Sequence, residues 1–204
     1  MSVGDWLYLG LLAAVGAWRI GEMRLSRAHQ RALAARGLGR ARDPVFPFMV
    51  ALHTAILVGA AIEASVARRP FFAPLVVASL ALFVGANLLR LWVIRTMAAH
   101  WNVNVVNSLP LGVVASGPFR WVRHPNYVAV FVELLALPLV HGAYVTALLG
   151  AGLHALVLAR RIADEERVLL ADSTYRRLMA GKPRFFPWPP ASPSPASELR
   201  TPPV

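Results

Sequence analysis

Residues 117–127 read Gly-Pro-Phe-Arg-Trp-Val-Arg-His-Pro-Asn-Tyr and form a dense polar block immediately before an apolar run. The block combines a turn, two permanent cations, an imidazole, a proline at which a helix can begin, and two hydrogen-bonding side chains. In that order these are Gly117-Pro118, Arg120 and Arg123, His124, Pro125, and Asn126 with Tyr127. Such a block suits an anionic or polar ligand at a membrane surface.

The composition predicts the class of protein. The chain has 204 residues, enough for one domain, of which 57% are hydrophobic and 15% charged. This is too apolar for an ordinary soluble domain and predicts an all-α polytopic membrane protein. Cysteine is absent, which excludes a disulfide framework and a thiolate metal site. The net charge of +11 indicates a partner at the lipid bilayer and no nucleic acid, because the cations lie between and beside apolar runs.

Apolar runs predict about five transmembrane helices in a single domain over residues 1–187, followed by a flexible Pro-rich tail over 188–204. The fourth run has 14 residues, or about 21 Å of helix, against a hydrocarbon thickness of roughly 30 Å. We therefore expect its helix to begin at Pro125, with the polar block at the membrane interface. The short link His141-Gly142 predicts that the last two spans form an antiparallel hairpin. The five runs are Val3–Ile20, Val45–Ala67, Phe71–Leu89, Tyr127–Val140 and Ala143–Ala159.

Arginines are concentrated in the segment Glu22–Asp43, where apolar residues recur at helical spacing. This pattern predicts an amphipathic helix on the membrane surface, which ends at Asp43-Pro44. Because basic segments favour the cytoplasmic side, we expect the N-terminus outside and the polar block and C-terminus in the cytoplasm.

Two polar residues of the second span have a structural interpretation. Glu63 lies near Arg68 and Arg69, which predicts an interfacial ion pair, and His53 is interpreted as structural as well. Residues 100–107 alternate between polar and apolar types, which predicts a short extended segment or surface loop. This segment is expected either to cover a bound ligand or to be a solvated connector.

The predicted hairpin brings together two polar blocks that are distant in sequence, at the start of the fourth span and the end of the fifth. Salt bridges between residues four apart, Arg160 with Asp164 and Arg161 with Glu165, explain part of the second block. The two blocks together have the geometry of a binding site. Their order and spacing resemble the isoprenylcysteine carboxyl methyltransferase family of integral membrane enzymes. The matching motifs are Gly117-Pro118-Phe119-Arg120, Arg123-His124-Pro125-Asn126-Tyr127, Glu165-Glu166 and Tyr175.

This resemblance implies a methyltransferase that uses S-adenosylmethionine, with S-adenosylhomocysteine as product, and a cofactor-binding part over residues 117–187. Arg123 or His124 is expected to receive the cofactor carboxylate, Glu165 or Glu166 the ammonium or ribose, and aromatic rings the adenine. The expected cofactor-binding set is Arg123, His124, Pro125, Asn126, Tyr127, Glu165, Glu166 and Tyr175. The expected catalytic set is Arg120, Arg123 and Glu133, and the chemistry requires no metal.

The acceptor is expected to be a lipophilic small molecule, and two chemistries remain open. A carboxylate, as in a prenylcysteine, is ionised at neutral pH and needs only a cation such as Arg120 or Arg123. A phenol or enol benefits from a proton acceptor, for which Glu133 or His124 is available. Asn126 and Glu133 resemble bacterial family members that methylate alkylpyrones or alkylresorcinols, which implies a bacterial inner membrane.

Two other functions are compatible with the sequence. An NADPH-dependent sterol or enone reductase would place Arg, His and Tyr similarly in its last helices, but such enzymes usually have more spans. A non-catalytic membrane scaffold would explain the hydropathy but not the two polar blocks. The sequence predicts no oligomeric state.

Overall fold

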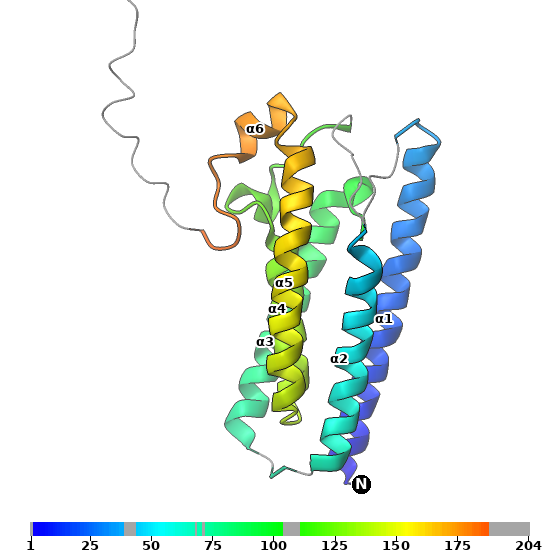
Figure 1. Ribbon diagram of the computed structural model, residues 1–204, viewed down its shortest axis with the longest axis vertical. Helices are drawn as coiled ribbons and strands as arrows, with labels where there is room; N and C mark the ends of the chain where they lie inside the picture. Colours follow the sequence, from blue (N-terminus) through cyan, green and yellow to red (C-terminus); the bar gives the residue numbers. More distant parts are fainter. Residues whose placement is uncertain (1, 39–43, 68, 71, 104–110, 188–204) are drawn as a thin grey trace, which may run out of the picture.

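The computed structural model describes residues 2–38, 44–67, 69–70, 72–103 and 111–187. Within these ranges every regular element is a helix, which confirms the all-α prediction. The long helices run along the longest axis of the molecule (Figure 1), and short helices lie at one end. The elements in chain order are α1 (Val3–Ala34), α2 (Phe46–Ala67), α3 (Ala73–Met97), η1 (Ala98–His100), η3 (Gly117–Arg120), α4 (Pro125–Leu139), α5 (Tyr144–Leu169) and α6 (Ser173–Met179).

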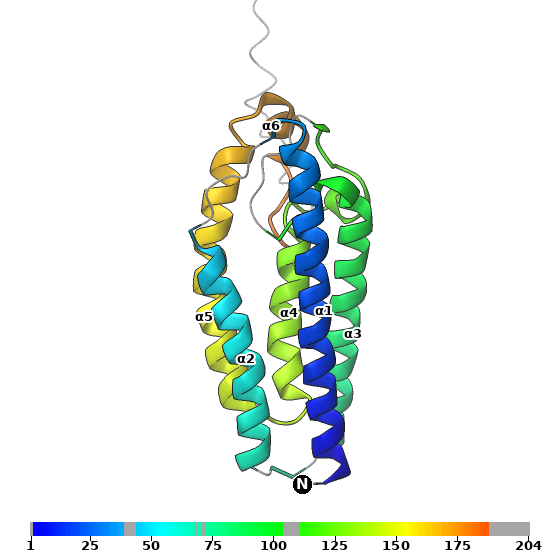
Figure 2. The same ribbon diagram turned by 90° about the vertical axis from the view of Figure 1, so that its right-hand side faces the viewer.

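Successive long helices alternate in direction, so the molecule has two distinct ends (Figures 1 and 2). The N-terminal end contains the start of α1, the end of α2, and the turn between α4 and α5. The polar end contains η3, the start of α4, the end of α5, and α6. The expected tail over residues 188–204 lies outside the described residues.

Helix α1 differs from the prediction. It is one continuous helix of 32 residues, and the segment expected to form a separate surface helix from Glu22 extends it to Ala34. The prediction of a separate helix is therefore wrong. Gly21 does not interrupt α1, because one helical glycine costs only about 1 kcal/mol and Glu22 is paired with Arg90 of α3.

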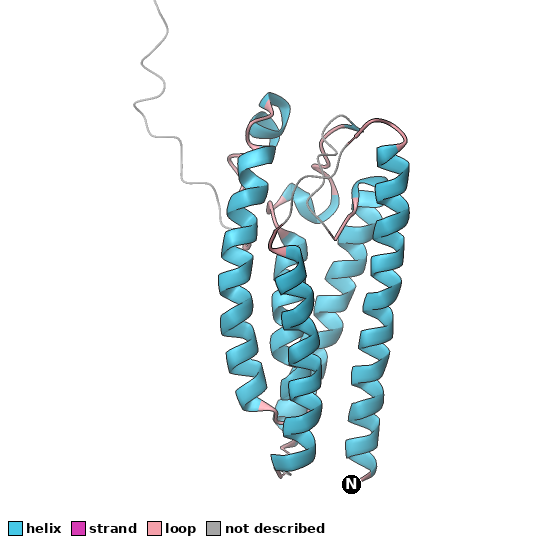
Figure 3. Cartoon of the chain, turned by 45° about the vertical axis from the view of Figure 1, so that its right-hand side comes forward, coloured by secondary structure: helices cyan, strands magenta, loops and turns pink. Residues whose placement is uncertain are grey.

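The hairpin between α4 and α5 is confirmed. Helix α4 begins at Pro125, as predicted, and α5 begins at Tyr144. Gly142 has φ of 70°, a left-handed conformation that glycine adopts without a steric penalty, and this allows the tight turn. The hairpin carries α5 back along α4 and beyond its start (Figure 2), and Figure 3 shows that loops and turns connect the helices of the described residues.

Small residues allow α2 and α5 to approach closely. A Cβ atom on Gly150 would lie 2.8 Å from Cγ1 of Ile56, a distance that side chains do not tolerate. Ala60 of α2 and Ala147 of α5 are fully buried. Many larger apolar side chains point outward instead, including Leu82 and Leu148, as expected for helices surrounded by lipid.

Within the described ranges, three helices are long and apolar enough to cross a membrane: Phe46–Ala67, the helical stretch Ala73–His100, and Tyr144–Leu169. The chain is therefore a membrane protein, although the prediction of five spans is supported only in part. Helix α4 is apolar but has 15 residues, about 22 Å, and α1 carries charges along its second half.

Candidate functional site

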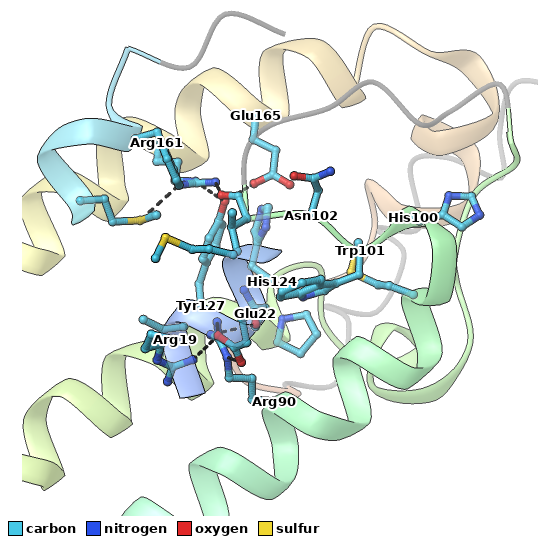
Figure 4. Close-up of a pocket in the computed structure, with 18 of the residues that line it drawn as sticks. Arg19, Glu22, Arg90, His100, Trp101, Asn102, His124, Tyr127, Arg161 and Glu165 are labelled. Carbon is cyan, nitrogen blue, oxygen red and sulfur yellow. Dashed lines mark hydrogen bonds and ion pairs between the residues drawn. The ribbon is translucent and has the colours of Figure 1, made fainter. Parts of the chain in front are cut away.

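A cavity of about 440 Å³ lies at the polar end of the bundle. All five long helices line it, together with η3, α6 and part of the segment after α3. Small-molecule sites typically enclose about 300–1,000 Å³, so its size suits a ligand such as a nucleoside. Two groups of polar side chains stand out in its wall (Figure 4): Arg161, Tyr127 and Glu165 in one, and Arg19, Glu22 and Arg90 in the other.

The first wall of the cavity is the entry into α4. His124 precedes a proline, and its backbone is non-helical, with φ of −125° and ψ of 55°. The backbone N–H groups of Arg123 and His124 donate to the carbonyls of Pro183 and Arg184, each at 2.9 Å. The C-terminal segment therefore holds this part of the chain in place.

Helix α5 provides the opposite wall and touches the first through a tyrosine. The Tyr127 hydroxyl donates a short hydrogen bond to Glu165, and Nε of Arg161 donates to the same hydroxyl at 3.0 Å. Arg161 also bonds to the carbonyl of Val103. The two polar blocks that are distant in sequence are therefore in direct contact.

Glu166 is not among the residues that line the cavity, and its buried carboxylate is the centre of an ion cluster. Its carboxylate lies 2.9 Å from Nε2 of His124, 3.3 Å from Nη1 of Arg123 and 2.7 Å from Nη2 of Arg184. The hydrogen bond to Glu166 raises the pKa of the Arg184 guanidinium, so this arginine keeps its charge. The cluster fixes α5, the start of α4 and the C-terminal segment relative to one another.

A second buried ion cluster lies deeper, among α1, α3 and α4. Glu22 accepts hydrogen bonds from both Nε and Nη2 of Arg90, at 2.7 and 2.6 Å. Arg19 pairs with Glu22 at 2.5 Å and also with Glu133, whose side chain is 2% exposed. Two arginines and two glutamates thus neutralise one another, and Arg90 also reaches the Asn126 amide oxygen at 3.4 Å.

The segment after α3 closes over the cavity. Trp101 is buried, and Asn102 accepts a hydrogen bond from Ser26 of α1 at 2.6 Å. The cavity is lined here by Trp101, Asn102 and Val103. This agrees with the expectation that the segment covers a site, rather than with that of a solvated connector. Residues 104–107 lie outside the described residues.

Tyr175 of α6 completes the aromatic part of the wall. Burial raises the pKa of its hydroxyl to about 12. The phenol therefore stays protonated at neutral pH and remains a hydrogen-bond donor.

The structure separates the expected site residues into two groups. Three of them, Arg120, Glu133 and Glu166, are not among the residues that line the cavity. Arg120 is exposed and lies over the Trp121 ring, with Cζ 5.4 Å from the ring centroid. Seven expected residues do line the cavity: Arg123, His124, Pro125, Asn126, Tyr127, Glu165 and Tyr175.

Sequence reasoning missed several polar residues of the cavity wall. Arg19, Glu22 and Arg90 looked like rim charges, and two histidines gave no motif. The spacing of Arg19 and Glu22, three apart on one helix, was a usable indication of a pair. Nothing in the sequence pairs Arg90 with Glu22 across 68 positions. The missed residues are Arg19, Glu22, His53, Arg90, Trp101 and His154, whereas Arg161 was expected only as a salt-bridge partner of Glu165.

Apolar membrane-length helices that pack around a partly polar cavity at one end define a membrane protein with a candidate small-molecule site. The sequence profile of the isoprenylcysteine carboxyl methyltransferase family matches residues 79–171, which include most of α3 and all of α4 and α5. The uncharacterised protein YpbQ of Bacillus subtilis is 27% identical over 165 residues, covering 80% of this chain and 95% of that protein. An uncharacterised protein of Haemophilus influenzae is 30% identical over 158 residues, covering 77% and 91%. The chain belongs to the isoprenylcysteine carboxyl methyltransferase family, and this membership indicates a membrane methyltransferase.

The cavity has the chemical groups that S-adenosylmethionine, the methyl donor of this family, would need. Arg123 offers a cation to a carboxylate, and its buried Nε has no hydrogen-bond partner among the described residues. Glu165 offers an anion to an ammonium or hydroxyls, and Tyr127 and Tyr175 offer aromatic faces. An orphaned buried donor is costly unless a ligand satisfies it, so the residues present fit this cofactor.

Proposed function

We propose that this protein transfers a methyl group from S-adenosylmethionine to a lipophilic small molecule in the membrane. The observation that carries the proposal is the meeting of the two polar blocks across one cavity, through Tyr127, Arg161 and Glu165. S-adenosylmethionine supplies an electrophilic methyl group on a sulfonium that leaves as a neutral thioether. The protein then needs to orient two ligands and exclude water, and a metal is not required.

The polar half of the cavity is the proposed cofactor half. Arg123, which lines the cavity just before α4, binds the carboxylate. Glu165 accepts from the ammonium or the ribose, and its hydrogen bond to Tyr127 fixes both side chains. Glu166 acts indirectly, because it positions His124 and Arg123 from behind.

The apolar half of the cavity is the proposed acceptor half. Its lining includes Ile20 of α1 and Leu57 of α2, and the Ile20 side chain is half exposed on the outer surface. An acceptor with a long alkyl or prenyl chain is therefore able to enter sideways from the bilayer. Two acceptor classes fit this description. One is a carboxylate, as in a prenylcysteine-like compound, and the other is a hydroxyl, as in an alkylpyrone- or alkylresorcinol-like lipid.

The proposed orientation places the cavity on the cytoplasmic side of a bacterial inner membrane. The supporting observation is the number of arginines near the polar end, on the second half of α1 and the end of α3. S-adenosylmethionine is made in the cytoplasm, so this orientation gives it access to the cavity.

Binding and transfer assays on the full-length protein test the proposal. We expect calorimetry in detergent to show saturable binding of S-adenosylmethionine, and radiolabel to pass to membrane lipids or added acceptors. Glu165→Gln is expected to weaken binding about tenfold or more, because a charge-assisted hydrogen bond contributes roughly 1.5–3 kcal/mol. Asp164→Asn is the matched control, since Asp164 pairs with Arg160 and Arg167 outside the cavity lining.

Two results would contradict the proposal. Wild-type protein that binds NADPH and not S-adenosylmethionine would identify a reductase instead. Equal transfer by Glu165→Gln and Asp164→Asn would show that the described cavity is not the cofactor site.

A further inference from the structure

Two histidines that the proposed cofactor site does not use face each other in the cavity wall. Nε2 of His53 on α2 lies 3.4 Å from Nδ1 of His154 on α5, and the ring centroids are 5.0 Å apart. Both residues line the cavity, and His154 is 1% exposed. Phe131 of α4 stacks against His154 at 6.3 Å between ring centroids. The pair is therefore held by three helices.

The pairing leaves one ring nitrogen of His53 for a ligand. A hydrogen bond between two imidazoles uses Nε2 of His53 and Nδ1 of His154, as donor and acceptor in either order. Nε2 of His154 is buried and has no partner among the described residues. His53 is only partly buried, and its Nδ1 has no partner within the described part of the chain. If a ligand hydroxyl donates to Nδ1 of His53, that nitrogen carries no proton. The proton of the neutral ring is then on Nε2, and His53 donates from Nε2 to Nδ1 of His154.

The residues expected from the sequence to accept a proton are already engaged elsewhere. Glu133 is paired with Arg19 and does not line the cavity. His124 bonds through Nε2 to Glu166, which belongs to the ion cluster of the C-terminal segment. The histidine pair, in contrast, has no carboxylate partner among the described residues. It lies beside the apolar half of the cavity, close to Val50 and Leu57 of the lining.

The charges around the pair suit an oxygen that becomes negative. The charged groups that act on it are cations on three helices: Arg19 on α1, Arg90 on α3 and Arg161 on α5. Arg19 and Arg90 are themselves paired with Glu22, and Arg161 bonds to Tyr127. Because Glu22 and Glu133 offset the charges of Arg19 and Arg90, Arg161 is the cation that acts most directly on an oxygen anion beside the pair.

We propose that His53 accepts the proton of a hydroxyl acceptor, that His154 positions it, and that the substrate class is a lipophilic phenol or enol. This inference rests on the proposed methyl transfer. The acceptor O–H proton passes to Nδ1 of His53, and the oxygen electron pair forms the new O–CH₃ bond. The bond from that methyl carbon to the sulfonium sulfur breaks, and its electron pair stays on the sulfur. A carboxylate acceptor would have no use for this pair, because it is already ionised.

A pair of acceptors with the same alkyl chain tests the role of His53. One is an alkylphenol of ordinary acidity, and the other is an alkylnitrophenol that is ionised at the assay pH. His53→Gln is expected to slow methylation of the alkylphenol by about 100-fold or more, the usual contribution of a general base, and that of the nitrophenol only a few-fold. His154→Gln is expected to show the same selectivity with a smaller loss. His141→Gln is the control, since His141 pairs with Asp5 at the N-terminal end.

A binding measurement without the methyl donor gives an independent readout. The ionised form of the alkylnitrophenol absorbs at longer wavelength, so its spectrum reports whether it is bound as the anion. We expect wild-type protein and His141→Gln to bind it as the anion at a lower pH than His53→Gln does. Equal spectra for all three proteins would overturn the inference.

The failures of the two proposals are distinguishable. Loss of methylation by His53→Gln to the same extent with both phenols, or no loss with either, would overturn the role of His53. Wild-type methylation of a prenylcysteine carboxylate and of neither phenol would overturn the substrate class and leave the methyltransferase intact. Absence of S-adenosylmethionine binding by the wild-type protein would overturn the proposed function and this inference with it.

Discussion

The two ends of the bundle use the same residue types for different purposes. At the N-terminal end, Glu63 pairs with Arg69 at 2.7 Å and accepts hydrogen bonds from the backbone N–H groups of Val145 and Thr146. Arg69 in turn bonds to the carbonyl of Gly142. The contacts of Glu63 with Val145 and Thr146, and of Arg69 with Gly142, tie the end of α2 to the start of α5 and to the turn before it. The predicted ion pair of Glu63 is thus confirmed for Arg69, and Glu63 also satisfies free N–H groups at the start of α5.

At the polar end, arginines and glutamates also pair, but some of their polar atoms face a cavity instead of one another. Arg123 keeps a buried Nε with no partner among the described residues, and Glu165 lines the cavity beside Tyr127. An ion pair in a membrane protein is therefore not a functional indication by itself. The indication is a buried polar group that remains unsatisfied next to a space that a ligand would fill.

The largest expected effect is on the cluster that holds the polar end together. In Glu166→Gln, the largely buried Arg123 loses the anion that neutralises it, and the half-exposed Arg184 loses its partner as well. Breaking a buried ion pair by removing one partner costs about 3–5 kcal/mol, so we expect a large loss of stability and activity. Thermal unfolding in detergent measures the first and radiolabel transfer the second. An unfolding midpoint equal to the wild type would contradict the assigned structural role.

The second prediction distinguishes a loss of ligand affinity from a loss of protein stability. Arg123→Ala is expected to weaken S-adenosylmethionine binding by about 10- to 100-fold, because a charged hydrogen bond to the ligand contributes roughly 1.5–3 kcal/mol. Arg69→Ala is the matched control at the N-terminal end and should leave binding per folded molecule unchanged. Calorimetry on both variants measures the difference. Equal affinities for the two variants would show that Arg123 is structural, as Arg69 is.

The general fold and the location of the site were predictable from the sequence for physical reasons. Proline fixes the backbone at the start of a helix and glycine permits the tight turn, so Pro125 and Gly142 set the limits of the hairpin. Once the hairpin is known, the two polar blocks have to meet, as they do at Tyr127 and Glu165.

The details of the site were not predictable, because they depend on contacts between helices that are distant in sequence. A glutamate such as Glu22 on a basic segment is typical of a surface helix, and only the packing of α1 against α3 buries it with Arg90. The same holds for His53 and His154, which lie 101 positions apart. Of the adjacent residues Glu165 and Glu166, only Glu165 lines the cavity. The rotation of α5 about its axis determines which of the two faces the cavity, and the sequence motif does not specify that rotation.

A smaller effect is expected at the N-terminal end. Glu63→Gln removes the charge that caps α5 and pairs with Arg69, but the amide oxygen can still accept hydrogen bonds from Val145 and Thr146. We expect a loss of about 1 kcal/mol in stability, typical of a weakened cap, with no change in the affinity for S-adenosylmethionine. Thermal unfolding and calorimetry on the same sample test both statements. Weaker binding at unchanged stability would contradict the division between the two ends.

The smallest effect is expected at Arg120, which the sequence motif places among the catalytic residues. In the structure this side chain is exposed and lies over the Trp121 ring, and Trp121 packs edge-on against Trp92 of α3 with centroids 5.8 Å apart. An exposed cation–π contact is worth about 0.5–1 kcal/mol, and aromatic residues with an arginine are typical of a membrane interface. Arg120→Ala should therefore change transfer by less than about twofold in detergent, whereas Arg123→Ala, three positions along the chain, is expected to weaken binding of S-adenosylmethionine by about 10- to 100-fold. A loss of transfer in Arg120→Ala equal to that in Arg123→Ala would mean that Arg120 turns inward when ligands bind, and the boundary of the site would then include η3.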